Sequence, residues 1–102
     1  MDLRILIADD EELDQKLIAH LLADNGFAQN QMLFVSDGVQ AVRIAKEEKP
    51  DLILLDILMP ALGGLEALKQ IRQINQDVKV VIISAYDEFS YAKEAMAEGA
   101  SA

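Results

Sequence analysis

Three apolar segments of the chain each end in side chains that could hold a cation or a phosphoryl group. The polar residues at these points are Asp9 and Asp10, then Asp56, then Ser84. If the fold brings the carboxylates together, two unit charges about 4 Å apart repel by about 4 kcal/mol at an effective dielectric constant of about 20. Such a group would raise its own pKa values or recruit a hard divalent cation such as Mg²⁺. A carboxylate held beside Mg²⁺ is also a competent nucleophile toward phosphorus, which gives an acyl phosphate.

Each of these residues also has a plainer interpretation. An acid after a strand often caps the following helix, where the helix dipole favours it, and this applies to Asp9 or Asp10 taken singly. Glu11 and Glu12 are typical of a solvated first helical turn. Asp56 is harder to explain in this way, because it directly follows four continuous apolar residues and stands where a buried strand emerges.

Strand-length apolar runs alternate with stretches of helical period along the chain. The predicted strands are residues 3–8, 32–35, 52–55 and 78–83. Apolar residues at three- and four-residue steps predict the inward faces of three helices: Leu13, Leu17, Ile18, Leu21 and Leu22; Val39, Val42 and Ala45; Leu65, Leu68 and Ile71. A fourth helix is expected to open at Asp87 or Ser90 and to continue through Ala92, Ala95 and Met96 to near Gly99.

Turn and capping residues mark the ends of these elements. Asn25 and Gly26 are expected to close the first helix, with Gly26 in the left-handed position after it. Ser36 or Asp37 is expected to cap the second helix, and Pro50 to follow its end.

The order βαβαβαβα predicts an α/β fold with a parallel sheet covered by helices on both sides. Residues 52–55 and 78–83 show no polar alternation, so both faces of these strands are expected to be buried. The C-terminal ends of parallel strands lie at one edge of the sheet, where ligands bind. If the first and third strands are neighbours, Asp9, Asp10 and Asp56 converge within a few ångströms there.

Composition limits the classes of function. The 102 residues suffice for one domain, and 52% of them are hydrophobic, so a core can form. The net charge of −9 argues against nucleic-acid binding, which needs clustered Lys and Arg. There is no cysteine, and no apolar run fits a secretory signal or a membrane span. These features predict a cytoplasmic domain that binds neither membrane nor nucleic acid directly.

The chain resembles the receiver domain of bacterial two-component response regulators over its whole length. The segments that carry the resemblance are, in order, Asp9-Asp10; Asp56-Ile57-Leu58-Met59-Pro60 with Gly64 and Glu66; Ser84-Ala85; and Gly99-Ala100. Residues 86–92 are further similar to regulators that carry an AraC-type DNA-binding output domain.

The resemblance implies a flavodoxin-like, doubly wound fold with strand order 2-1-3-4-5. It implies that Asp56 accepts a phosphoryl group from the histidine of a partner sensor histidine kinase. Asp10 and Asp56 would bind Mg²⁺ directly, Asp9 through water, and the Leu58 carbonyl would supply a further oxygen. Ser84 would hydrogen-bond the phosphoryl group, whose charge of about −1.5 to −2 switches partner interactions.

The sequence departs from the family pattern at its C-terminal end. We expect residues 1–102 to form a single receiver domain, C-terminally truncated, with strand order 2-1-3-4, without strand 5, helix 5 or an output domain. No lysine matches the one that pairs with the phosphoryl group in the family, and Gly63 stands where many members have an acid or Asn. We further expect self-association through the exposed edge of strand 78–83 or the uncovered sheet face.

Two other functions remain open at this stage. The chain could be a receiver-like interaction or assembly module that is never phosphorylated, since fold does not fix function. It could also be a phosphatase with Asp9 as nucleophile and Glu11 as its partner. If the phosphatase alternative is set aside, we expect a signalling domain that is not an enzyme. Its only expected chemistry is self-phosphorylation and autodephosphorylation.

Overall fold

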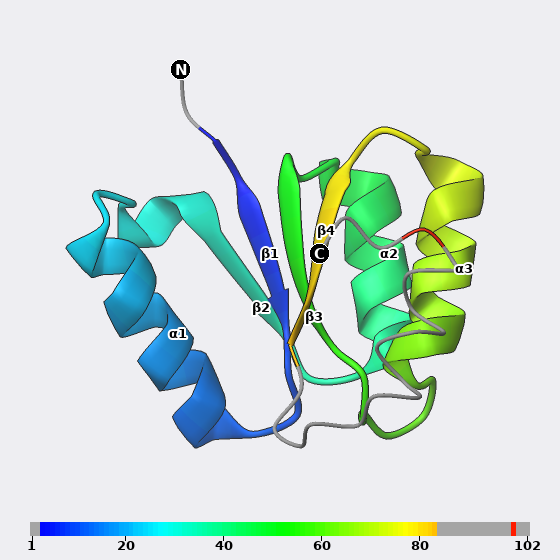
Figure 1. The fold of residues 1–102 in the computed structure, drawn as a ribbon, viewed down its shortest axis with the longest axis horizontal. Helices are drawn as coiled ribbons and strands as arrows, with labels where there is room; N and C mark the ends of the chain where they lie inside the picture. The colour runs from blue at the N-terminus through cyan, green and yellow to red at the C-terminus, as the bar shows by residue number, and fades with distance from the viewer. Residues whose placement is uncertain (1–2, 84–98, 100–102) are drawn as a thin grey trace.

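Strands and helices alternate along the part of the chain that the computed structural model describes, residues 3–83 and 99 (Figure 1). The elements are β1 (Ile5–Ala8), α1 (Glu12–Asp24), the 3₁₀ turn η1 (Gln29–Gln31), β2 (Met32–Val35), α2 (Gly38–Glu48), β3 (Leu52–Asp56), α3 (Gly64–Ile74) and β4 (Lys79–Ile83). The predicted alternation is confirmed through β4. Ser84 and the helix expected after Asp87 or Ser90 lie outside the described residues.

The four strands form one parallel sheet in the order β2-β1-β3-β4. This is the predicted order, and it makes β1 and β3 neighbours. Ala8 of β1 pairs in register with Leu55 of β3, so Asp9 and Asp56, one residue further along, leave the sheet side by side. The register alone therefore brings the acidic strand ends together.

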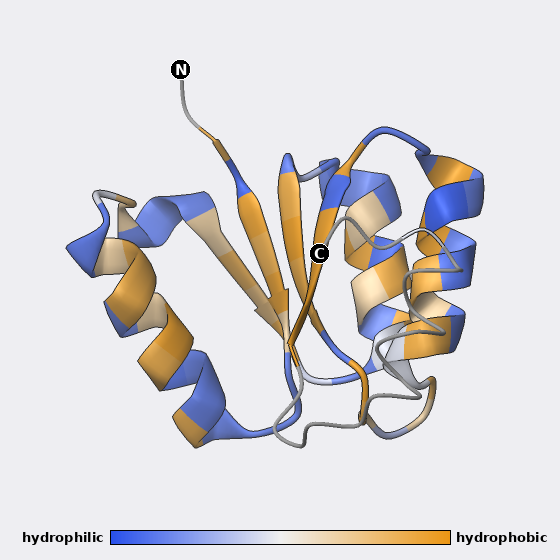
Figure 2. Ribbon diagram, viewed as in Figure 1, coloured by the Kyte–Doolittle hydropathy of each residue, from blue (hydrophilic) through white to orange (hydrophobic). Residues whose placement is uncertain are grey.

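The larger core lies between the sheet and the pair α2 and α3, which Figure 1 shows on the same side. Its fully buried side chains include Leu6, Ile53 and Leu55 from the sheet and Leu68 and Ile71 from α3. Burying a side chain of this size stabilises the fold by about 1.5–3 kcal/mol. Figure 2 shows the same division, with apolar colour along the strands and polar colour on the outer sides of the two helices. The predicted inward face of α3 is confirmed.

Helix α1 covers the other face of the sheet, and the prediction for its inward side is confirmed only in part. Ile18 and Leu22 do pack against Ile5, Ile7 and Met32. The leucines at steps of four from the start of the predicted stripe are instead exposed: Leu13 by 78%, Leu17 by 59% and Leu21 by 54%. The predicted stripe was too wide, because a helix on one half of a sheet contacts it along a narrow strip.

Two further burial predictions need correction. In β3 only Ile53 and Leu55 are buried, whereas Leu52 and Leu54 on the α1 side are half-buried. In β4 Val80 is buried and the three following residues are half-buried. Val39 was expected to face inward from α2, but it is 56% exposed, because Ala41 and Ala45 face the core instead.

Local turn chemistry follows the sequence closely. Asp37 caps α2, with its carboxylate accepting a hydrogen bond of 2.8 Å from the Gln40 amide. Gly26 follows α1 with φ of +94°, the left-handed conformation that glycine adopts without strain. None of the helices in the described part of the chain has the length and apolar composition that crossing a membrane requires.

Candidate functional site

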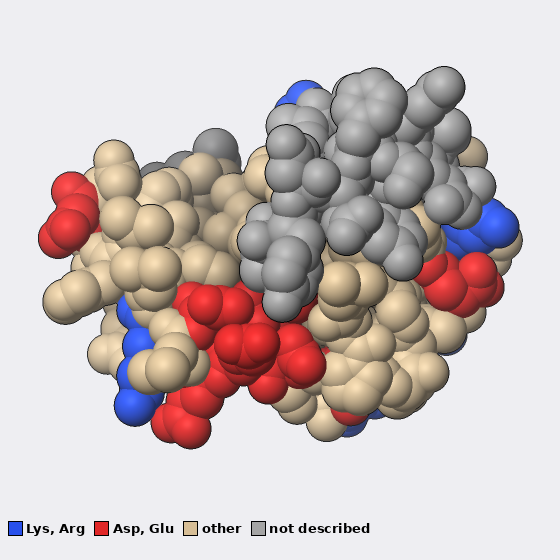
Figure 3. Space-filling view, turned by 60° about the horizontal axis from the view of Figure 1, so that its bottom comes forward, with Lys and Arg blue, Asp and Glu red and all other residues tan. Residues whose placement is uncertain are grey.

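Three carboxylates meet at the C-terminal edge of the sheet. Asp9, Asp10 and Asp56 each offer an oxygen atom, and these oxygens lie within 4.8 Å of one another. Figure 3 shows a large patch of acidic side chains near the middle of this side of the molecule, with smaller acidic groups toward its edges. The predicted convergence of these three residues is confirmed.

Burial and hydrogen bonds fix Asp9 more firmly than a helix-capping residue would be. Its side chain is only 1% exposed, and its Oδ1 accepts a hydrogen bond of 3.0 Å from the Glu11 amide. Its own amide donates to the Val35 carbonyl at the end of β2 (3.1 Å). The N-cap residue of α1 is Glu11, without a side-chain cap bond, so the capping interpretation of Asp9 and Asp10 was wrong.

Asp56 and Asp10 present the accessible part of the pocket. Asp56 is half-buried at the last position of β3, and its Oδ1 accepts a hydrogen bond of 3.2 Å from the Leu58 amide. Asp10 is exposed. The pocket is therefore graded, with one carboxylate buried, one half-buried and one open to water.

Burial and mutual repulsion shift the pKa values in this pocket. The pKa of Asp56 is raised to about 6, chiefly by burial and further by the charges of Asp9, Asp10 and Asp14, against the hydrogen bond from the Leu58 amide, which lowers it. Burial also raises the pKa of Asp9, against the opposing hydrogen bond from Glu11. Folding therefore forces carboxylates together at a cost, and a bound cation would remove that cost.

The start of α3 lies very close to the backbone of Asp56, because its first residue, Gly64, has no side chain. The Gly64 amide donates to the Ile57 carbonyl (2.8 Å). A Cβ atom on Gly64 would overlap the Asp56 carbonyl oxygen and lie 2.6 Å from the Ile57 Cα. At the start of α2, a Cβ on Gly38 would likewise overlap the Leu62 carbonyl in the same loop. Both helix starts thus lie directly against the backbone of Asp56 or of the loop that follows it.

The donor set fits a hard divalent cation. Three carboxylate oxygens close together, with an exposed side toward water, match the coordination habits of Mg²⁺, which keeps waters and takes few carboxylates. Three ionised acids this close together repel one another, and a bound cation would relieve that repulsion.

Two residues near the pocket were missed by the sequence analysis. Asp14, in the first turn of α1, adds charge that raises the pKa values of both Asp9 and Asp56. Gln15 donates its side-chain amide to the Asp9 carbonyl (2.6 Å). A usable signal was present, since Gln15 lies three, four and seven residues before Ile18, Ala19 and Leu22, on the face of α1 that packs against the sheet.

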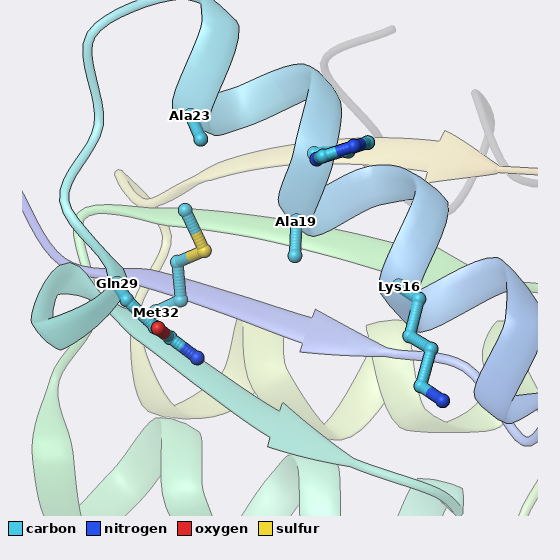
Figure 4. Close-up of a pocket in the computed structure, with 6 residues that line it drawn as sticks. Lys16, Ala19, Ala23, Gln29 and Met32 are labelled. Atoms are coloured by element: carbon cyan, nitrogen blue, oxygen red, sulfur yellow. The ribbon is translucent and has the colours of Figure 1, made fainter.

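A separate hollow of about 390 Å³ lies between α1 and the strand β2. Ala19 and Ala23 of α1 face Met32 and Gln29 across it, with Lys16 at one end (Figure 4). Its lining contains none of the three pocket carboxylates, so this hollow is not part of the acidic pocket.

Comparison with known proteins agrees with this geometry. The family model described as response regulator receiver domain matches residues 5–102. The chain is 38% identical to the chemotaxis protein CheY of Bacillus subtilis over 97 residues, which are 95% of this chain and 79% of that protein. It is 39% identical to the alkaline phosphatase synthesis transcriptional regulatory protein PhoP of the same organism over 88 residues, but these are only 35% of PhoP and 86% of this chain.

One of the similar solved structures contains magnesium. The receiver domain of the sensor histidine kinase PA1611 from Pseudomonas aeruginosa is similar to this chain with a TM-score of 0.85 and 27% identity. The similarity covers 99% of this chain and 82% of that one, and that receiver domain holds a magnesium ion in its active-site cleft.

Replacing Asp56 by Asn is expected to stabilise the metal-free protein at neutral pH. Because the pKa of Asp56 is raised to about 6, the folded state binds a proton before the unfolded state as pH falls from 7 to 4. The cost of the charge is therefore complete above pH 6 and is lost toward pH 4. Urea unfolding without divalent cations should show Asp56→Asn more stable by about 1–3 kcal/mol at pH 7 and nearly equal at pH 4.

The matched control is Asp77→Asn, an exposed acid in the loop before β4, which should change stability by less than about 0.5 kcal/mol at both pH values. Equal stability of Asp56→Asn and the unaltered chain at pH 7 would contradict the expected cost of charge in the pocket.

Replacing Gly64 by Ala is expected to disturb the pocket, whereas replacing the adjacent Gly63 is not. A Cβ on Gly63 meets only the Ile57 carbonyl at 3.7 Å, an ordinary contact. Gly64→Ala should cost about 1–3 kcal/mol of unfolding free energy and weaken Mg²⁺ binding, and Gly63→Ala should cost less than about 1 kcal/mol. Chemical denaturation and Mg²⁺ titration measure both effects, and indistinguishable variants would show that the loop has room to move.

Proposed function

The chain belongs to the family of response regulator receiver domains, and from this premise we propose that it accepts a phosphoryl group on Asp56 from a phosphohistidine of a sensor histidine kinase. The observation that carries the proposal is the convergence of Asp56 with Asp9 and Asp10 at one sheet edge. Receiver domains are signalling domains rather than ordinary enzymes, and two-component signalling is the setting of the family.

Asp56 is the carboxylate best suited to act as nucleophile. It is half-buried and keeps one hydrogen bond from Leu58, so part of its carboxylate stays accessible to a donor. One carboxylate oxygen attacks phosphorus, the phosphorus–nitrogen bond of the donor breaks, and the electron pair leaves on the imidazole. The products are an acyl phosphate on Asp56 and a free histidine on the kinase.

In this proposal Asp10 and Asp56 would hold the cation directly and Asp9 through water, and the Leu58 carbonyl would supply a further oxygen. Bound Mg²⁺ supplies positive charge that neutralises the carboxylates and the transferred phosphoryl oxygens. Ser84, which we propose hydrogen-bonds the phosphoryl group, lies outside the described residues. The kinase partner, a role in transcription regulation, a cytoplasmic location and the extent of the domain as residues 1–102 remain predictions.

The burial of Asp9 argues against the phosphatase alternative. A nucleophile must reach its substrate, and Asp9 is 1% exposed with one carboxylate oxygen bound to the Glu11 amide. Glu11, its expected partner, donates that amide from the N-cap position of α1. Asp56 meets the requirement of access better.

Incubation with Mg²⁺ and a small-molecule phosphodonor such as acetyl phosphate should add one phosphoryl group to the chain. Intact-protein mass spectrometry should show a gain of about 80 Da, because Asp56 is the accessible nucleophile. Asp56→Asn should show no gain, and Asp77→Asn should behave like the unaltered chain. A gain retained in Asp56→Asn would place the acceptor elsewhere, and no gain in any chain would leave the interaction module as the better function.

Self-association is the second candidate property, supported by the sheet face on the α1 side. Leu54 and Val81 pair in register, and both are only half-buried in the described structure. Sedimentation velocity from about 10 to 300 µM should therefore show a rising sedimentation coefficient, since exposed apolar surface favours association. Val81→Lys should abolish the rise, and a folded monomer of the unaltered chain at every concentration would refute self-association.

A further inference from the structure

We propose that Gln15 is a positioning residue of the acidic pocket, whose side-chain amide fixes the backbone between Asp9 and Asp10 and thereby sets the affinity for the cation. The inference rests on the proposed function, because it requires the pocket to bind Mg²⁺. It assigns a role to a residue that is neither a ligand nor a nucleophile.

One amide group of Gln15 joins three elements. Its Nε2 donates to the Asp9 carbonyl after β1 (2.6 Å) and to the Val35 carbonyl at the end of β2 (3.2 Å). The same Val35 carbonyl accepts the amide of Asp9 at 3.1 Å. Gln15 thus connects the first turn of α1 to the ends of the two strands beside the pocket.

The Asp9 carbonyl belongs to the peptide unit that leads into Asp10. Asp10 is exposed, so packing does little to orient its carboxylate, and the plane of the preceding peptide has to do so. Fixing that carbonyl against α1 turns the Asp10 side chain toward the common edge with Asp9 and Asp56. Loss of the donor would also remove the hydrogen bond to the partly buried Asp9 carbonyl, at a cost of about 1–3 kcal/mol, whereas the Val35 carbonyl would keep the amide of Asp9.

The chemistry of this position requires a donor. Both partners of the Gln15 side chain are carbonyl oxygens, which only accept hydrogen bonds. An apolar residue, which is the ordinary choice on the sheet-facing side of a helix, would pack against Ile18 and Leu22 but donate nothing. A glutamate of the same shape would repel both carbonyls when ionised.

The site also has room for replacement side chains. Gln15 lines an open hollow of about 210 Å³ together with Glu12 and Phe34. Side chains of similar length therefore fit there without overpacking, and variants can be compared in the folded state.

The test is calorimetric titration of the full chain with MgCl₂ for Gln15→Leu and Gln15→Glu beside the unaltered protein. Gln15→Leu should weaken Mg²⁺ binding about 10-fold, the lower end of the effect of outer-shell partners on metal affinity. Gln15→Glu separates two causes of a change in Mg²⁺ affinity, the added negative charge and the lost hydrogen-bond donor. Added negative charge alone would tighten cation binding, whereas loss of the donor to Asp9 should weaken it in spite of the charge.

The matched control is Gln31→Leu. Gln31 also bonds backbone groups through its side-chain amide, donating to the Leu3 carbonyl (2.8 Å) and accepting from the Ala28 amide (2.8 Å), but at the opposite end of the sheet. It should lower the urea midpoint as Gln15→Leu does and leave Mg²⁺ affinity unchanged. The ¹⁵N–¹H signal of Asp10 in the metal-free protein should shift in the two Gln15 variants and stay in place in Gln31→Leu.

Each outcome is decisive. Mg²⁺ binding by the Gln15 variants that equals that of the unaltered chain, or tighter binding by Gln15→Glu, would overturn the positioning role and leave the proposed function intact. Failure of the unaltered chain to bind Mg²⁺ would overturn both. If Gln15→Leu does not fold, Gln15→Glu keeps the length and volume of the native side chain, and its direction of change decides.

Discussion

The pairing of β1 with β3 brings carboxylates close together, so that they repel one another. The other features of the pocket act on that repulsion. Ala8 and Leu55 are partners in the sheet, so Asp9 and Asp56 have no freedom to separate once the strands form. Burial raises the pKa values of both residues, and the charges of neighbouring acids, Asp9 among them in the case of Asp56, raise them further. Backbone amides of Glu11 and Leu58 stabilise the ionised forms. The protein thereby stores an unfavourable charge arrangement that a cation, or the chemistry of a phosphoryl group, relieves.

The framework around the pocket is built for close backbone approach rather than for bulky packing. Gly38 and Gly64 begin two helices, and a Cβ atom would not fit at either: Gly38 lies against the Leu62 carbonyl in the loop after β3, and Gly64 against the Asp56 carbonyl at the end of β3. The two helices can therefore pack closely against this loop from the side of the larger core. This packing holds Asp56 at the edge of the sheet. Any rearrangement of the loop is felt at the starts of both α2 and α3, because well-packed interiors transmit strain.

Helix α1 has two faces with different relations to the pocket. Its inner face packs on Ile5 and Ile7. At the start of the helix, this face carries the polar side chain of Gln15 in place of an apolar one, and its amide donates to the Asp9 carbonyl. Its outer face exposes Leu13, Leu17 and Leu21. The same helix therefore joins the acidic loop to the core on one side and presents apolar surface to solvent on the other.

The sequence by itself determined the features that depend on neighbours along the chain. Strand ends near Asp9 and Asp56, a cap at Ser36 or Asp37 and the turn at Gly26 follow from apolar runs and local backbone chemistry, and the alternation of strands and helices implies the parallel sheet. The structure identifies Asp37 as the cap. Only the tertiary structure decided which side of α1 and α2 faces the sheet, because leucines at neighbouring helical positions are equivalent until a surface covers some of them. The same holds for Gln15, because its Asp9 and Val35 acceptors come within reach of its side chain only when α1 packs beside the ends of β1 and β2.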